Sequence, residues 1–142
     1  MTVFCPYATG FLRPETKKAL TGLATFVELR GDFAYHRFLI DRWKKGEKWI
    51  NVEHDCAPTG AQLEELWNCR HDWCSCGYHE LGDMIPFFGC VKFSADFIKV
   101  HQTLWDGPDL HWNGLDTHLA AHANVYFKPH LHKSVWHAKY HR

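Results

Sequence analysis

Residues 48–55, KWINVEHD, place an apolar strand directly before a pair of acidic residues. The stretch from 48 to 53 is rich in the aromatic and β-branched side chains that strands favour. Glu53 and Asp55 then stand one residue apart where this strand ends. Because ligands of open α/β sheets bind beyond the carboxyl ends of the strands, the segment predicts both a buried strand and the position of a site.

The sequence on either side of this segment alternates between strand and helix patterns. Two further strands are predicted over residues 2–7 and 25–29, and they alternate with helices at intervals of about 25 residues. This pattern is typical of an α/β domain with a parallel sheet flanked by helices.

Local signals mark where the predicted helices begin and end. Pro14 suits the first turn of a helix. Asp32 is expected to cap a second helix, which Gly46 ends. Thr59 and Gln62 have the spacing of a capping box at the start of a third.

The second half of the chain is less regular. Residues 69–84 are expected to be irregular, and residues 86–93 return to strand character. Ser94 is a candidate helix cap, residues 115–123 form a short predicted helix, and six of the twelve histidines fall between His118 and the last residue.

Length and composition fit one folded domain over residues 1–142. Hydrophobic residues make up 46%, which is enough for a core, and the formal net charge is zero, unlike a strongly basic nucleic-acid binder. The sequence shows no secretory signal and no apolar run long enough to span a membrane. We therefore expect a soluble cytoplasmic protein whose six cysteines are mostly reduced thiols.

Glu53 and Asp55 can present oxygen atoms to one cation at the strand's exit. Hard divalent cations such as Mg²⁺ or Mn²⁺ prefer oxygen ligands and accept phosphate oxygens in the rest of their shell. A cation held there would neutralise the charge that develops on a leaving nucleotide diphosphate.

The segment WINVEHDCAPTGAQLEELWNC, followed by WCSCGY and FFGCVKFSADFIKVHQTLW, resembles the small glycosyltransferase-like proteins of bacteria and their viruses. The resemblance covers about residues 2–112. It implies a minimal Rossmann-like GT-A nucleotide-sugar fold, in which an Asp-x-Asp type motif binds the metal and the diphosphate. Here that motif reads Glu53-His54-Asp55. Full GT-A enzymes are longer, so the part that binds the acceptor is the least defined.

The resemblance also implies further site residues. A third metal ligand often comes from a histidine near the C-terminus, and His132 is favoured over its neighbours in sequence. Asp116 is the candidate general base for the acceptor hydroxyl, or alternatively a helix cap or a group that orients the donor sugar. The nucleotide and the donor sugar are expected to contact Tyr7, Arg13, Glu28, Asp32 and Gly89.

The implied activity is transfer of a sugar from a nucleotide-sugar donor, most simply a UDP-sugar, to a hydroxyl acceptor. Similar small transferases decorate hydroxymethylated bases in viral DNA, so the expectation includes a bacteriophage protein that acts on DNA in the cytoplasm of its host. The basic, aromatic segment after residue 128 offers a phosphate-binding edge for such an acceptor. A homodimer would be one way to complete the acceptor site.

A second hypothesis comes from the cysteine-rich middle of the chain. Cys69, Cys74, Cys76 and His79 offer four soft ligands within eleven residues, a composition that can hold zinc although the spacing is unusual. In that case the chain would be a zinc-stapled module that binds nucleic acid or protein without catalysis.

Overall fold

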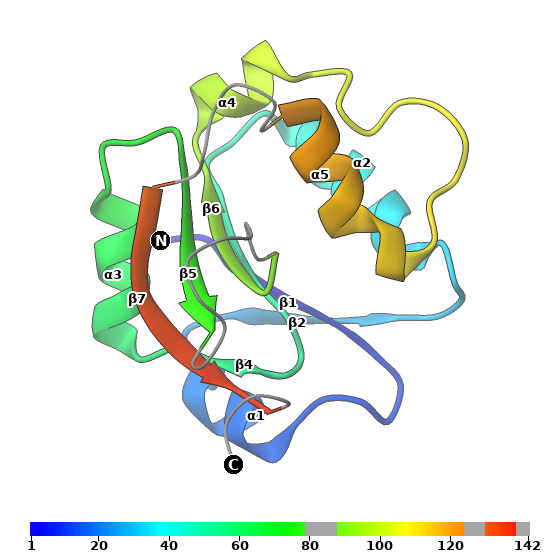
Figure 1. The fold of residues 1–142 in the computed structure, drawn as a ribbon. Coiled ribbons are helices and arrows are strands. Elements are labelled where there is room, and N and C mark those ends of the chain that lie inside the picture. The colour runs from blue at the N-terminus through cyan, green and yellow to red at the C-terminus, as the bar shows by residue number, and fades with distance from the viewer. Residues whose placement is uncertain (79–87, 124–129, 139–142) are drawn as a thin grey trace.

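The computed structural model describes residues 1–78, 88–123 and 130–138. Its strands form a mixed, curled sheet of seven strands in the order β2-β1-β3-β6-β5-β7-β4, with helices packed on both faces (Figure 1). The strands are β1 (Val3–Ala8), β2 (Thr25–Leu29), β3 (Trp49–Val52), β4 (Cys56–Ala57), β5 (Trp73–Tyr78), β6 (Cys90–Phe93) and β7 (His130–His137). The α-helices are α1 (Pro14–Leu20), α2 (Ala34–Lys45), α3 (Gly60–Asn68), α4 (Ala95–Val100) and α5 (Leu115–Ala123), and a 3₁₀ turn, η1 (Trp112–Gly114), precedes α5.

The first half of the chain is parallel, as the alternating pattern predicts. β1 pairs in parallel with both β2 and β3. The chain therefore leaves β1 toward one side of the sheet, then crosses back over β1 to form β3 on the other side. The carboxyl ends of β1 and β3 meet at the point where the direction of winding reverses, which is where open α/β sheets form their ligand crevice.

The second half is not parallel, so the prediction of a parallel sheet is wrong there. β6 runs antiparallel to both β3 and β5, while β7 runs parallel to β5. The stretch that joins β5 to β6 is shorter than the dozen or so residues that a parallel crossover needs, so the chain must return in the opposite direction.

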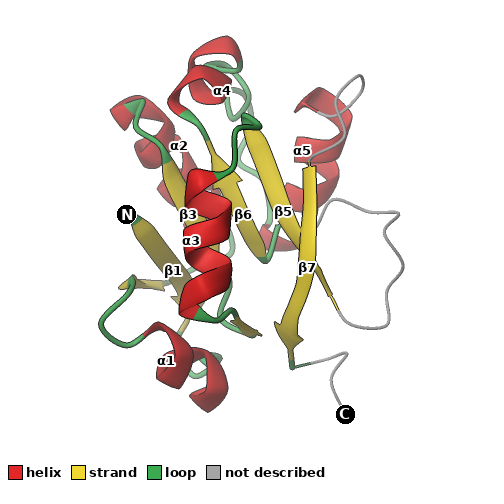
Figure 2. Cartoon of the chain, turned by 90° about the vertical axis from the view of Figure 1, so that its left-hand side faces the viewer, coloured by secondary structure: helices red, strands yellow, loops and turns green. Residues whose placement is uncertain are grey.

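Helices cover the two faces of the sheet separately. On one face α1 and α3 pack against the strands, and on the other face α2, α4 and α5 do so (Figure 2). Side chains of β3 alternate between these faces: Ile50 and Val52 join the first core, and Trp49 joins the second. Trp43 of α2 packs edge-on against Trp49, with ring centroids 6.4 Å apart, so the second core is largely aromatic.

Most of the predicted helix ends are confirmed. Pro14 is the first residue of α1, and Thr59 and Gln62 form a complete capping box at α3. Ser94 caps α4 by accepting a hydrogen bond from the Phe97 amide at 3.0 Å. Gly46 ends α2 in the left-handed conformation, with φ 65°.

Asp32 is not the cap of α2, which begins at Ala34 after Phe33 and has no side-chain cap. The Asp32 carboxylate instead lies 3.9 Å from His111 Nε2, and the backbone carbonyl of Asp32 accepts a hydrogen bond from the Trp112 amide. Its side chain is therefore engaged with the segment before η1.

β5 is a strand within the stretch that was expected to be irregular. The strand predicted over 86–93 is confirmed from Cys90 to Phe93. The helix predicted over 115–123 is confirmed with those bounds. Across the described ranges, every helix is too short or too polar to cross a membrane.

Candidate functional site

The backbone of the acidic motif is held by bonds from three neighbouring segments. The amide of Arg13, in the loop after β1, donates to the carbonyl of His54 at 3.0 Å. The amide of Glu53 donates to the carbonyl of Gly89 at 2.8 Å, and the Cys56 amide closes a turn onto the Glu53 carbonyl at 3.1 Å. The motif is thus fixed just beyond the carboxyl end of β3.

A C-terminal histidine reaches this motif through the pairing of β4 with β7. The two strands are antiparallel, with Cys56 opposite His137, and the Ala138 amide donates to the Asp55 carbonyl at 2.9 Å. His137 Nε2 lies 3.2 Å from Asp55 Oδ2. Both side chains are largely buried, at 7% and 22% exposure, so the pair is shielded from water.

The charge state of Asp55 follows from this pairing. Burial opposes ionisation, but the hydrogen bond from His137 and the nearby imidazoles of His54 and His137 outweigh it and lower the pKa of Asp55. Burial in turn lowers the pKa of His54, although Asp55 partly offsets that effect. Asp55 is therefore an ionised carboxylate over the whole neutral range.

Glu53 faces the opposite way and belongs to a buried polar chain. Asn51 Nδ2 donates to the hydroxyl oxygen of Tyr35 at 2.7 Å and to the carbonyl of Phe88 at 3.2 Å. The Tyr35 hydroxyl donates to the Glu53 carboxyl group. Burial, together with the charges of Asp116 and Asp55, raises the pKa of Glu53 well above its usual range.

Asp116 lies in the first turn of α5 and completes the cluster of carboxyl groups. Removal of its carboxyl group from water raises the pKa to about 6, and the charge of Asp55 adds to the shift. A hydrogen bond from the Phe88 backbone partly opposes it. The residue as a whole remains exposed, so Asp116 sits at the border between the buried site and solvent.

These residues fit a divalent cation. Donor atoms of Asp55, Cys56 and His137 lie within 4.8 Å of one another. Carboxylate and imidazole donors suit manganese and related divalent metals. Burial is the main cause of the raised pKa values of Glu53 and Asp116, and the charge of Asp55 adds to both shifts.

The other residues predicted from the sequence lie in several different elements around this cluster. Tyr7 and Glu28 are register partners near the ends of β1 and β2, and Glu28 accepts a hydrogen bond from Thr9 and pairs with Arg30 at 3.4 Å. Gly89 contributes its backbone carbonyl to Glu53. His132, the favoured metal ligand, lies beside Glu65 of α3 instead of Asp55.

Sequence reasoning missed the roles of three residues. Tyr35 and His137 were not predicted as site residues from the sequence, where His132 was the favoured histidine. Asn51 did offer a signal, because an amide inside an otherwise apolar strand needs buried partners. His79 lies outside the described residues.

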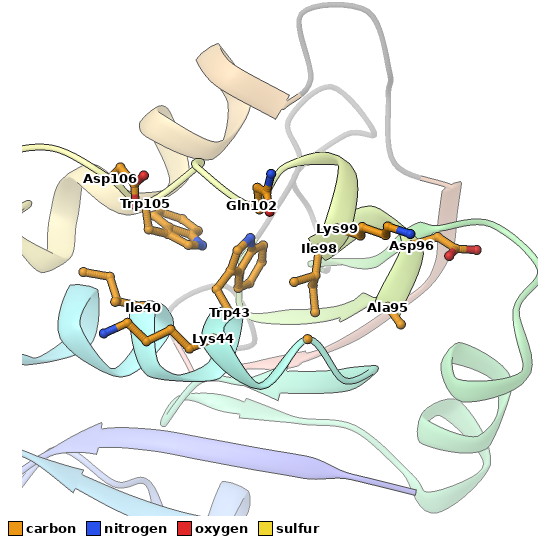
Figure 3. Close-up of a pocket in the computed structure, with 11 residues that line it drawn as sticks. Ile40, Trp43, Lys44, Ala95, Asp96, Ile98, Lys99, Gln102, Trp105 and Asp106 are labelled. Atoms are coloured by element: carbon orange, nitrogen blue, oxygen red, sulfur yellow. The ribbon is translucent and has the colours of Figure 1, made fainter.

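A separate pocket of about 550 Å³ opens between α2 and the α4 segment (Figure 3). Trp43 and Trp105 form its aromatic wall, and Lys44 and Lys99 stand at its rim. None of the acidic-cluster residues lines it, so it is distinct from the candidate site.

Comparisons with known proteins bear on the fold. No protein-family model and no curated protein matches the chain. Among solved structures it is similar to a glycosyltransferase involved in the glycosylation of the major capsid of PBCV-1, with TM-score 0.55 and 10% identity over 94% of this chain and 82% of that one. It is also similar to A197 from STIV, with TM-score 0.45 and 14% identity over 70% and 68% of the two chains. The first likeness is one of fold.

Proposed function

We propose that this chain is a metal-dependent glycosyltransferase on a small GT-A type fold, which binds a nucleotide-sugar donor and transfers the sugar to a hydroxyl group. The observation that carries the proposal is the Asp55–His137 pair, joined by Glu53 and Asp116, at the winding-reversal point of the sheet. The shared fold with a viral glycosyltransferase supports it.

We propose that Asp55 and His137, whose donor atoms lie close to each other and to Cys56, hold Mn²⁺ or Mg²⁺, with His137 in the role that the sequence suggested for His132. A bound cation would stabilise the charge that develops on the leaving diphosphate. Glu53, hydrogen-bonded to Tyr35, forms part of the polar wall of the site beside that position.

Asp116 is the proposed general base for the acceptor hydroxyl. Its carboxyl group has a pKa near 6, so at neutral pH it is mostly ionised yet still basic enough to accept a proton. It also lies at the solvent border, where an acceptor would arrive.

The donor side is proposed to lie along the ends of β1 and β2. In this proposal Arg13 and Tyr7 contact the nucleotide of a UDP-sugar, Glu28 contacts the base or ribose, and Gly89 lies beside the donor sugar. Asp32 is the least favoured of the predicted contacts, because its carboxylate already faces His111.

The acceptor is proposed to be a molecule that carries a hydroxyl group and has a ring that can stack on an aromatic side chain. Phe11 is 64% exposed, and its ring lies 6.3 Å from that of His54, beside the acidic motif. Such a ring suits a sugar or an extruded base, including a hydroxymethylated base of viral DNA.

The test is a thermal-shift screen of the pure protein with nucleotide diphosphates and nucleotide sugars, with and without manganese. A ligand that binds only the folded state raises the melting temperature with its concentration. We expect a manganese-dependent shift for one nucleotide class, lost in Asp55→Asn and kept in Asp41→Asn, an exposed carboxylate on α2. The absence of any shift in folded protein would instead favour the binding-module hypothesis.

A further inference from the structure

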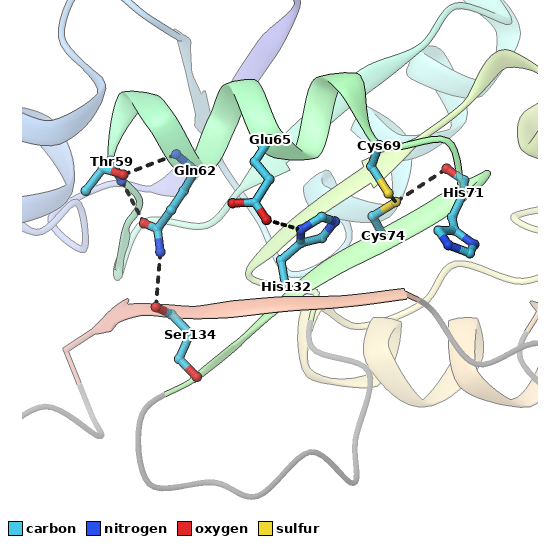
Figure 4. Close-up of polar contacts among 8 residues, drawn as sticks. All are labelled: Thr59, Gln62, Glu65, Cys69, His71, Cys74, His132 and Ser134. Carbon is cyan, nitrogen blue, oxygen red and sulfur yellow. Dashed lines mark hydrogen bonds and ion pairs between the residues drawn. The ribbon is translucent and has the colours of Figure 1, made fainter.

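A second group of metal-ligating side chains lies away from the acidic motif. Cys69 follows the end of α3, Cys74 lies in β5 and His132 lies in β7. Donor atoms of these three residues lie within 4.8 Å of one another. Figure 4 shows the His132 ring between Glu65 and the two cysteines.

One ring nitrogen of His132 is buried and has no hydrogen-bond partner among the residues that the structure describes. Its side chain is only 8% exposed, and Nδ1 lies 3.0 Å from Glu65 Oε1. Nε2 is fully buried and has no hydrogen-bond partner within the described ranges of the chain. A histidine that ligates a metal through one nitrogen while a carboxylate holds the other has this arrangement. An orphaned ring nitrogen is otherwise costly to bury.

We infer that Cys69, Cys74 and His132 bind a zinc ion, with Glu65 orienting the histidine. Two thiolates and one imidazole form a set that favours zinc over manganese or magnesium. His130 is opposite Cys74 in the sheet register, and its ring centroid lies 4.7 Å from that of His132.

The charges around the group balance. Lys92 is 1% exposed, and its ammonium donates to the carbonyls of Cys69, at 3.0 Å, and His71. Two thiolates and the Glu65 carboxylate would offset the charges of the zinc ion and of Lys92. The charge of the buried Lys92 therefore does not prevent zinc binding when both cysteine ligands are thiolates.

The ligand set differs from the one that spacing suggested. Cys76 is buried beside Cys90 and interacts with it instead of with Cys69 and Cys74. A disulfide between Cys69 and Cys74 is the competing chemistry, since their sulfur atoms are 2.8 Å apart. It would leave His132 Nε2 buried without a partner, whereas zinc would satisfy all three groups.

Such a zinc ion would fasten β7 to the junction of α3 and β5. β7 also carries His137, which reaches Asp55. The zinc site would therefore hold in place the strand that completes the candidate active site, while being chemically separate from it.

The test measures zinc in the full chain, expressed with zinc supplied and purified without chelator. Elemental analysis should find about one zinc per chain, lost in Cys69→Ser, Cys74→Ser and His132→Gln. It should persist in the controls Cys5→Ser and His101→Gln, and in Asp55→Asn, which separates this site from the proposed catalytic metal. If the cysteine variants fail to fold, cobalt substitution of the unaltered chain gives a second readout, because two thiolate ligands produce an intense sulfur-to-cobalt charge-transfer absorption.

Zinc-free protein with both thiols titratable, or with Cys69 and Cys74 joined as a disulfide, would overturn the inference. So would cobalt binding without the charge-transfer absorption. Nucleotide binding has no part in any of these readouts, so the failure of the proposed function would leave them unchanged.

Discussion

Replacement of Asp116 by Asn should stabilise the metal-free protein at neutral pH. The pKa of Asp116 is raised from 3.8 to about 6, so the folded state binds this proton more tightly than the unfolded state does. Stability from this group is therefore present at low pH and is lost as pH rises from about 4 to about 6. This change in pKa of about 2 corresponds to a free energy of about 3 kcal/mol. Because Asp116 is exposed, we discount this to about 1 kcal/mol.

Asp96→Asn is the matched control, because Asp96 is the second residue of α4 as Asp116 is of α5. Both substitutions remove a charge from the first turn of a helix, so the difference between them isolates the acidic cluster. Melting curves of metal-free protein at pH 8 should place Asp116→Asn about 3 °C above the control, and the gap should close near pH 4. A gap that is absent at pH 8, or that persists at pH 4, would refute the reasoning.

Three other substitutions test the surrounding structure. His137→Gln should raise the pKa of Asp55, because the hydrogen bond that helps to lower this pKa is lost. The stability that a lowered pKa provides is lost as the pH falls through that pKa, so the acid side of the melting-temperature profile should move to higher pH. An unchanged profile would count against the Asp55–His137 interaction. Lys92→Met should lower the free energy of unfolding in urea by about 2 kcal/mol, because two partly buried carbonyls lose their charged donor; a neutral effect would contradict this. Thr59→Ala should lower the free energy of unfolding in urea by about 1 kcal/mol, and Thr59→Ser should lower it much less, because serine keeps the helix cap. Equal losses would exclude the capping box as the cause.

The parts of the fold that the sequence predicted well are those fixed by neighbours along the chain. The capping box of Thr59 and Gln62, the proline at the start of α1 and the strand at Trp49–Val52 each depend on a few adjacent residues. Local chemistry therefore decided them, and tertiary packing did not override it.

The parts that were missed are fixed by partners far along the chain. β5 is a strand because β6 and β7 pair with it, although its sequence, WCSCGY, has little strand propensity of its own. β4 is only two residues long, yet its pairing with β7 is what brings His137 to Asp55. No local pattern marks a strand of that length.

The choice between His132 and His137 could not be made by counting alternate residues. The pairing of β7 with β5 shifts register between Cys76 and Tyr78, so the simple alternation of faces along β7 is broken. His132 lies near the start of β7 and His137 at its end, so the two histidines reach different clusters from one strand.

The position of β7 also has a consequence for the order in which the molecule is assembled. The strand inserts between β5 and β4, two segments from much earlier in the chain, and only then does Asp55 acquire His137 as a partner. Contacts of such long sequence separation form late in folding, because the whole intervening chain must first be closed into a loop. During synthesis the acidic motif would thus emerge before His137, and the proposed metal site would be completed only when β7 docks.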